Sequence, residues 1–262
     1  MPFTLSHPAA VLPLARRPLV PSALVAGSVA PDVFWFVPRP VPDVGLSKTH
    51  EFASALWLDP LIALLLLALF HVLLKRPLLA LAPQPLAERL PRQFSWRRPG
   101  WIALSLVLGA LTHVGWDAFT HESGGLAFLR IPLVTGVDVG RLIQLVSTIA
   151  GAVVLAWWLV RWYRLAPTRP APPRSRYPKA ATAFLAAGVV TGMLAETLPF
   201  LAEHDPMTHA GVFGNATYLA VTGAVSGFFA ALGLYALAWY MSLYAKRATR
   251  KGDPFCEEEL RR

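Results

Sequence analysis

The chain has 262 residues, of which 55% are hydrophobic and only 15% are charged. A soluble domain usually carries about 25% charged residues. With a mean hydropathy of +0.49, the composition excludes an ordinary soluble protein and indicates an integral membrane protein. The net charge of +9 does not indicate nucleic-acid binding, because the basic residues lie in short blocks between apolar runs. The single cysteine, Cys256, excludes an intrachain disulfide framework.

The first apolar region is interrupted by prolines and carries Arg16 and Arg17, so it does not have the form of an ordinary signal peptide. The segment 19–37 is long enough to cross a membrane, but prolines and Asp32 interrupt it. It fits a span and a re-entrant segment equally well. If it spans, Asp32 reaches the outer side and His7 does not; if it re-enters from outside, both residues can reach that side.

Five later segments are each apolar and long enough to cross a bilayer as a helix. They are residues 55–74, 101–120, 141–163, 180–202 and 215–244. The sequence therefore predicts an all-α, polytopic transmembrane helical bundle with about five clear spans plus the N-terminal segment. We expect residues 1–245 to form one membrane-embedded domain and residues 246–262 to form a charged cytoplasmic tail.

The distribution of positive charge predicts the orientation of the chain. The loops 75–100 and 161–179 and the tail from residue 246 are basic, and alternate spans place all three on one side. The loops 121–140 and 203–214 contain few arginines or lysines and fall on the other side. Because positively charged loops stay in the cytoplasm, the basic side is expected to be cytoplasmic.

Three groups of metal-ligand type recur at four-residue intervals in the second clear span: His113, Asp117 and His121. Four residues of α-helix advance 400°, so the three side chains share one stripe. His113 and Asp117 lie about 6 Å apart along the axis, which suits one metal ion, whereas His121 lies about 12 Å from His113. The alternative is a His–Asp hydrogen bond that joins two helices. For His121 we expect a second ion, a break of the helix near Thr120 or another role.

Other polar residues are weaker candidates when each is taken singly. His7 lies near the terminus, Asp32 follows a proline and His50 lies in a polar connection. A solvated or turn residue is the ordinary explanation for each of them.

The remaining candidates also have plain explanations. His204, Asp205 and His209 lie close together in an outer loop and fit a solvated turn around Asp-Pro. Glu196 is a carboxylate within a span and is a functional candidate by default. Asp59 precedes a proline at the start of the first clear span, which is typical of a helix N-cap.

Three stretches of the sequence resemble a family of bacterial multi-pass membrane proteins that is catalogued only as a domain of unknown function. They are the opening Met-Pro-Phe-Thr-Leu-Ser-His-Pro-Ala-Ala-Val, the segment 22–32 ending in Ala-Pro-Asp, and the segment 109–121. The resemblance covers roughly the first 240 residues. It implies a multi-pass protein of the bacterial cytoplasmic (inner) membrane.

More distantly, the sequence is similar to predicted membrane-bound, metal-dependent hydrolases of the LexA-regulated type. Those proteins carry an N-terminal His, a Pro-Asp turn, a Thr-His-Ser segment and a His-x-x-x-Asp helix. The matching positions here are His7, Asp32, His50, His113 and Asp117. The segment 48–51, Lys-Thr-His-Glu, departs from the pattern because it lacks Arg-Gly before the threonine and serine after the histidine.

Together these observations lead to a functional hypothesis: a membrane-embedded, metal-dependent hydrolase of esters or phosphoesters with its site at the extracytoplasmic face. The five matching residues would hold one or two divalent ions, with Zn²⁺ expected for a His/Asp set. His121 is the expected catalytic acid–base group or a further ligand. The expected partners are the lipid bilayer and a lipid or envelope-linked substrate, with no nucleic acid. The alternative is a non-catalytic membrane protein, or an ion or proton carrier, in which the His–Asp cluster is structural.

Overall fold

The computed structural model describes residues 4–37, 48–91, 93–120, 131–134, 137–170, 174–204 and 212–251. Helices make up 81% of the structure. The strands within these residues are one short antiparallel pair, β1 (Pro132–Val134) and β2 (Val137–Asp138). The predicted all-α class is therefore confirmed.

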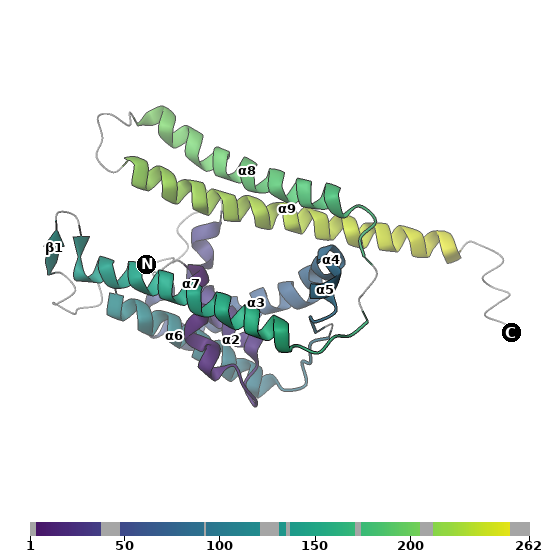
Figure 1. Ribbon diagram of the computed structural model, residues 1–262, viewed down its shortest axis with the longest axis horizontal. Helices are drawn as coiled ribbons and strands as arrows, with labels where there is room; N and C mark the ends of the chain where they lie inside the picture. Colours follow the sequence, from purple (N-terminus) through teal and green to yellow (C-terminus); the bar gives the residue numbers. More distant parts are fainter. Residues whose placement is uncertain are drawn as a thin grey trace. The chain divides into compact units, whose positions relative to one another are not determined.

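Five helices within the described residues are long and apolar enough to cross a membrane, as predicted. The first is continuous from Leu58 to Leu81 and consists of α3 (Leu58–Ala68), a π-helical turn (Leu69–Leu74) and α4 (Lys75–Leu81). The others are α6 (Pro99–Thr120), α7 (Val139–Leu165), α8 (Pro178–Glu203) and α9 (Val212–Lys251) (Figure 1).

The boundaries differ from the predicted ones at two places. The first span does not end at residue 74, and α4 and the short α5 (Gln84–Ala87) occupy the start of the expected loop 75–100. Pro77 does not interrupt this span, because it lies within the first turn of α4, where proline is tolerated, and the wider π-helical turn precedes it. At the other end, α9 continues to Lys251, past the expected end of the span at Tyr244.

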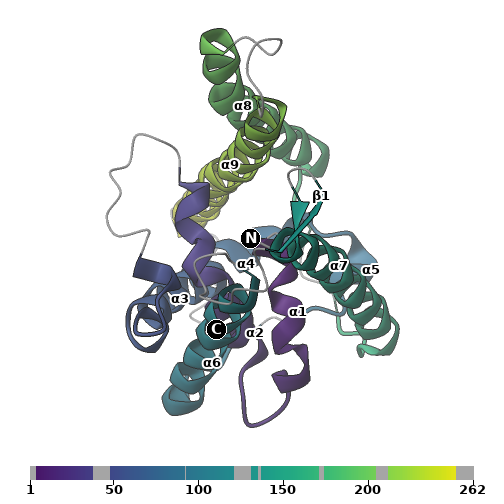
Figure 2. The same cartoon turned by 90° about the vertical axis from the view of Figure 1, so that its left-hand side faces the viewer.

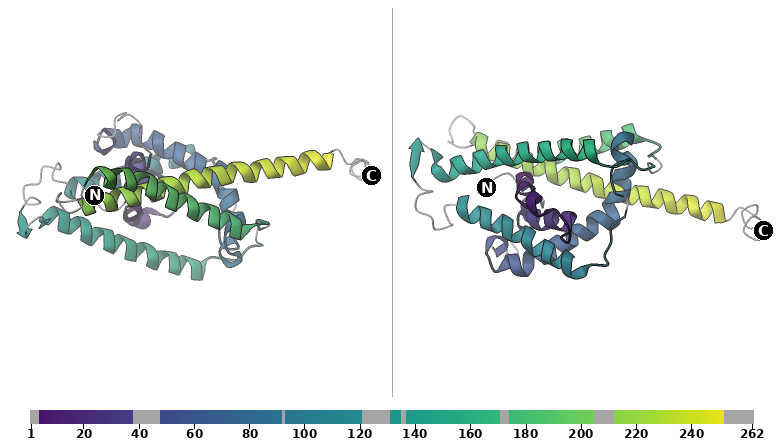
Figure 3. Two further views of the ribbon diagram at one scale, coloured as in Figure 1. Left: turned by 90° about the horizontal axis from the view of Figure 1, so that it is seen from above. Right: turned by 60° about the horizontal axis from the view of Figure 1, so that its bottom comes forward.

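The chain divides into two compact units, Met1–His71 with Glu88–Pro170, and Val72–Ala87 with Ala171–Arg262. In the second unit α8 and α9 lie side by side as a hairpin (Figures 1 and 3). Glycines at i and i+4 permit this close contact, because a Cβ on Gly192 would lie 2.1 Å from the Gly223 carbonyl oxygen. Small residues at such spacing are typical of helix pairs in membranes.

In the first unit, the N-terminal segment lies between α6 and α7 (Figure 2). It consists of the 3-10 helix η1 (Thr4–Ser6), α1 (Pro8–Val11), η2 (Leu12–Leu14), α2 (Pro21–Val29) and the 3-10 helix η3 (Ala30–Phe36). The nine residues of α2 are far fewer than the ~20 that a spanning helix needs.

The path of this segment is re-entrant. His7 lies beside Asp117 near the end of α6, the Val20 amide donates a hydrogen bond to the Ser105 hydroxyl at 2.9 Å, and Asp32 returns to within 3.4 Å of His113. Ser105 and Asp117 are separated by about 18 Å along the helix. The segment therefore descends along α6 and comes back, which brings both ends to one place. Irregular backbone at this depth is stable where protein buries it.

Two glycines allow α2 to cross α6 at backbone contact. A Cβ on Gly27 would lie 2.2 Å from the Leu106 carbonyl oxygen, and a Cβ on Gly109 would lie 2.3 Å from the Leu24 carbonyl oxygen. Both neighbours are backbone atoms, so neither can turn aside. This crossing sets how closely the end of α2 approaches His113.

We expect Gly109→Ala to destabilise the protein, since the added methyl group must push the two helices apart. Overpacking of this kind costs about 1–3 kcal/mol, which corresponds to a fall in melting temperature of about 3–10 °C for a protein of this size. Thermal unfolding in detergent would measure it. Gly115→Ala on the same helix is the matched control, because a Cβ there meets nothing within 4 Å. Equal melting temperatures for the two variants would contradict the close crossing.

Candidate metal centre

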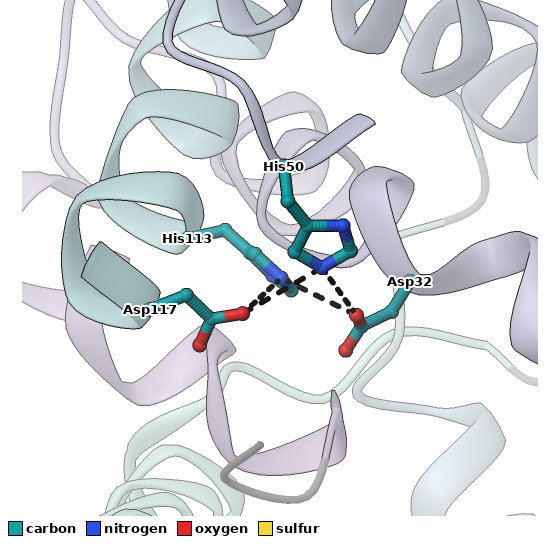
Figure 4. A group of neighbouring side chains, drawn as sticks. All are labelled: Asp32, His50, His113 and Asp117. Carbon is teal, nitrogen blue, oxygen red and sulfur yellow. Dashed lines mark hydrogen bonds and ion pairs between the residues drawn. The ribbon is translucent and has the colours of Figure 1, made fainter. Parts of the chain in front are cut away.

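Four side chains from three separate elements converge at the end of α6 (Figure 4). Asp32 comes from η3, His50 from the 3-10 helix η4 (Lys48–His50), and His113 and Asp117 from adjacent turns of α6. One nitrogen or oxygen atom from each lies within 4.8 Å of the corresponding atom of every other member. We call these four residues the His/Asp quartet.

The quartet alternates nitrogen and oxygen. Asp32 Oδ1 lies 3.1 Å from His50 Nε2 and 3.4 Å from His113 Nε2. Asp117 Oδ2 lies 3.4 Å from His113 Nε2 and 3.6 Å from His50 Nε2. Ligands about 2.0–2.2 Å from a tetrahedral ion lie roughly 3.3–3.6 Å from one another. Three of these four separations lie in the range that a single Zn²⁺-sized ion requires, and the fourth, between Asp32 and His50, is 3.1 Å.

The Nε2 atom of His113 faces the two carboxylates of the quartet because its other ring nitrogen, Nδ1, is hydrogen-bonded elsewhere. Nδ1 lies 2.7 Å from the Ser28 carbonyl oxygen, so it carries the proton and donates it to that carbonyl. In a 3-10 turn, the Ser28 carbonyl would accept a hydrogen bond from the amide of the residue three positions later. That residue is Pro31, which has no N–H to donate. The neutral tautomer therefore has its lone pair on Nε2, which is the form that binds a metal.

Hydroxyl groups orient two further members of the quartet. Thr4 donates to Asp32 Oδ2 at 2.6 Å, which leaves Oδ1 facing the two imidazoles. Thr49 donates to the Pro31 carbonyl at 2.9 Å, and its oxygen lies 3.3 Å from His50 Nδ1. Such supporting hydrogen bonds commonly fix the orientation of metal ligands.

His7, the fifth residue expected from the sequence, lies directly beside the quartet. Its ring stacks on that of His113 with centroids 3.8 Å apart, and its Nε2 lies 3.7 Å from Asp117 Oδ1. Asp117 thus directs one carboxylate oxygen toward His7 and the other toward the quartet. Nε2 of His7 is buried and has no hydrogen-bond partner among the described residues.

His7 and Asp32, which both come from the N-terminal segment, are in the protonation state that a metal ligand requires. Burial, reinforced by the neighbouring His113, lowers the pKa of His7 from 6.5 to about 4, so its imidazole is neutral at pH 7. Burial alone would raise the pKa of Asp32, but the contacts with His113, His50 and Thr4 outweigh it and hold this pKa well below its ordinary value. Asp32 is therefore a carboxylate.

The centre is buried on most sides and opens at one. Asp32 and His113 have no exposed surface and Asp117 is 4% exposed, whereas the His50 side chain is 22% exposed. Buried ionisable groups are costly unless they are paired or bound to an ion. His50 is therefore the most exposed member of the quartet.

The structure corrects the interpretation of Asp59 as a helix cap. Trp57 occupies the N-cap position of α3, and Asp59 is fully buried in the first turn. Its Oδ2 lies 2.9 Å from the Ser54 hydroxyl, while its Oδ1 has no hydrogen-bond partner among the described residues. Sequence reasoning missed this buried carboxylate because Asp-Pro is so common at helix starts. It missed Thr4 because no pattern distinguishes that hydroxyl.

Several predicted candidates do not belong to the described centre. His121, Asp205 and His209 lie outside the described residues. Glu196 and His204 belong to the second unit, and the His204 Nδ1–H donates to the Phe200 carbonyl at 3.0 Å. Among the residues described, the quartet is the group with metal-ligand spacing.

The fold and the centre define the class: a polytopic helical membrane protein with a buried His/Asp cluster in its N-terminal unit. Within that class, the chain belongs to the family described as Domain of unknown function (DUF4184), which matches residues 1–237. This confirms the resemblance to an uncharacterised family. No curated protein and no solved structure matches the chain.

Proposed function

We propose that Asp32, His50, His113 and Asp117 bind a divalent metal ion, and that the ion supports hydrolysis of an ester or phosphoester. The observation that carries this proposal is the alternation of two imidazole nitrogens and two carboxylate oxygens at 3.1–3.6 Å. Two carboxylates neutralise the charge of a divalent ion, and the buried surroundings strengthen that attraction.

The donor set favours a reactive ion over a structural one. Structural zinc sites are usually rich in cysteine, whereas catalytic sites use histidine and carboxylate ligands and keep a position for water. We propose Zn²⁺ as the ion, with His7 as a further ligand or the holder of a second ion through Asp117. The side open at His50 gives water access. We propose His121 as the acid–base group, since it continues the stripe of His113 and Asp117.

The chemistry assigned to the ion is general to such sites. A bound divalent ion lowers the pKa of a water molecule to about 7 and polarises the bond to be broken. The chain itself positions the ligands: Thr4 and Thr49 hold Asp32 and His50 in place, and Ser28 fixes the tautomer of His113. These residues keep the centre ready to bind without rearrangement.

We further propose that the centre faces the extracytoplasmic side of a bacterial inner membrane. This rests on the basic loop 161–179 and the basic residues after 246, which alternate spans place opposite the end of α6 that carries Asp117. On this proposal, residues 246–262 are cytoplasmic.

The test is hydrolysis by the full chain purified in detergent. With added Zn²⁺ or Mn²⁺, we expect the wild type to cleave 4-nitrophenyl esters or bis(4-nitrophenyl) phosphate, and Asp32→Asn to lose this activity, at least about 100-fold in kcat/KM. Asp138→Asn is the matched control. Asp138 caps α7 by accepting from the Arg141 amide, and asparagine caps a helix equally well. Equal activity of wild type and Asp32→Asn would contradict the proposal.

A non-catalytic centre is the second candidate. His113 lies 3.4 Å from both carboxylates, so a protonated His113 would pair with them and join α2, η3 and α6 without an ion. A protein that binds no metal and hydrolyses no ester or phosphoester would have this role. A carrier would instead show metal- or pH-dependent flux in vesicles.

A further inference from the structure

A cavity adjoins the centre within the first unit. Its volume is about 470 Å³, and η1, α1, the end of α6 and one face of α7 line it. Its walls are formed mainly by small and apolar residues, among them Ala9, Ala10, Ile143, Val146, Ala150 and Val154. Ser147 also lines it, but its hydroxyl is engaged with carbonyl groups of its own helix.

His7 lies between this cavity and the His/Asp quartet, although no member of the quartet itself lines the cavity. His7 lines it, is only 4% exposed, and has a buried Nε2 without a hydrogen-bond partner among the described residues. The same nitrogen lies 3.7 Å from Asp117. Trp116, the residue before Asp117, also lines the cavity. A molecule in the cavity with its polar end at His7 would therefore lie next to the quartet.

The opposite wall belongs to a helix suited to lipid. No residue in the apolar stretch of α7 is fully buried, and Val146 is 56% exposed. Side chains on this face therefore border hydrocarbon when α7 spans a membrane. Apolar walls of this kind favour an apolar occupant, because contact between the two removes apolar surface from water.

The cavity volume can be compared with the volumes of two apolar occupants, a partner helix and a hydrocarbon chain. A helix about 10 Å wide fills roughly 420 Å³ per turn, so the cavity would hold little more than one turn of a partner helix. A hydrocarbon chain about 4.5 Å wide and as long as one leaflet, about 15 Å, needs roughly 240 Å³. The volume of the cavity exceeds that of such a chain.

We propose that this cavity binds one hydrocarbon chain of a membrane lipid and presents the polar head of that lipid to the His/Asp quartet. The assignment of the lipid as substrate rests on the proposed hydrolase function. The binding of the chain does not, because it depends only on the apolar walls.

The test uses palmitic acid with a diazirine near the end of its chain, added in trace amounts to phosphatidylcholine vesicles that contain the full-length protein. After illumination, peptide mass spectrometry locates the adducts. We expect adducts on residues 6–10, where η1 and α1 line the cavity. Ala150→Phe fills the cavity and should lower this labelling about tenfold, the effect of excluding two methylene groups. Ala152→Phe, on the same helix outside the cavity lining, should leave it unchanged.

The outcomes separate the two proposals. Equal labelling of residues 6–10 in Ala150→Phe and Ala152→Phe, or no labelling of these residues in the wild type, overturns the lipid-chain site, even if the protein hydrolyses soluble esters. A protein that dimerises and shows no labelling there has a second copy in the cavity, which also overturns it. Labelling that Ala150→Phe abolishes, in a protein without hydrolase activity, supports the site and removes the substrate role. If Ala150→Phe unfolds, Val146→Trp at an exposed position replaces it.

Discussion

The wild-type protein should keep about one equivalent of a divalent ion through purification in detergent, and His113→Ala should keep none. His113 contacts both carboxylates of the quartet and is fully buried, so the remaining ligands cannot close around an ion without it. Loss of a group that merely supports a ligand lowers metal affinity about 10–100-fold, and loss of a ligand should exceed this. Metal analysis by mass spectrometry after chelation and reloading measures the difference.

His71→Ala provides the matched control for this experiment. His71 contacts the Ser22 hydroxyl at 3.1 Å and stacks on Phe94 with ring centroids 3.9 Å apart, away from the quartet. Removing it takes one histidine from the same unit without touching the centre. If His71→Ala and His113→Ala lose metal equally, the loss reflects general unfolding. If neither the wild type nor the variants bind metal after reloading, the quartet is an ion-pair clasp.

Thr4→Val should weaken metal binding about 10–100-fold while the protein keeps its fold. The Thr4 hydroxyl donates to Asp32 Oδ2 at 2.6 Å and is the hydrogen bond that turns Oδ1 toward the imidazoles. Valine has nearly the same shape, so the change removes the hydrogen bond and leaves the packing. Competition of the purified protein with a fluorescent zinc chelator gives the affinity.

The control for Thr4→Val lies on α6 itself. Thr112 precedes His113, but its hydroxyl donates to the Gly109 carbonyl of its own helix at 2.7 Å. Thr112→Val should therefore leave the affinity unchanged. An unchanged affinity in Thr4→Val would mean that Asp32 needs no orientation, and would weaken its assignment as a ligand.

Much of the fold follows from local sequence. Long apolar runs define five helices whatever their neighbours, and the spacing of His113 and Asp117 places both on one face of α6, where their atoms lie 3.4 Å apart. The re-entrant path of the N-terminal segment, from His7 to Val20 and back to Asp32, does not follow in this way. It depends on the crossing of α2 and α6 at Gly27 and Gly109. These two glycines are far apart in the sequence, and the residues around each of them do not reveal the contact.

In the candidate site, too, some features can be predicted from local sequence and others depend on the folded chain. The residues of metal-ligand type are visible in the sequence, and the structure brings five of them together. Their supports are ordinary residues whose role depends on tertiary contact: the Ser28 carbonyl, the Thr4 hydroxyl and the Thr49 hydroxyl. Asp59 was misinterpreted because a local rule for helix starts gave it a sufficient explanation, whereas its burial against Ser54 requires the folded chain.

The re-entrant N-terminal segment has a consequence for how the protein is assembled during synthesis. This segment is made before the helix that shelters its backbone, since α6 begins some seventy residues after α2 ends. Exposed peptide groups are not stable in lipid, so the segment cannot rest in the bilayer during that interval. It must wait at the membrane surface or within the insertion machinery. The His/Asp quartet then closes only when α6 arrives, which makes the completed centre a marker that insertion has succeeded.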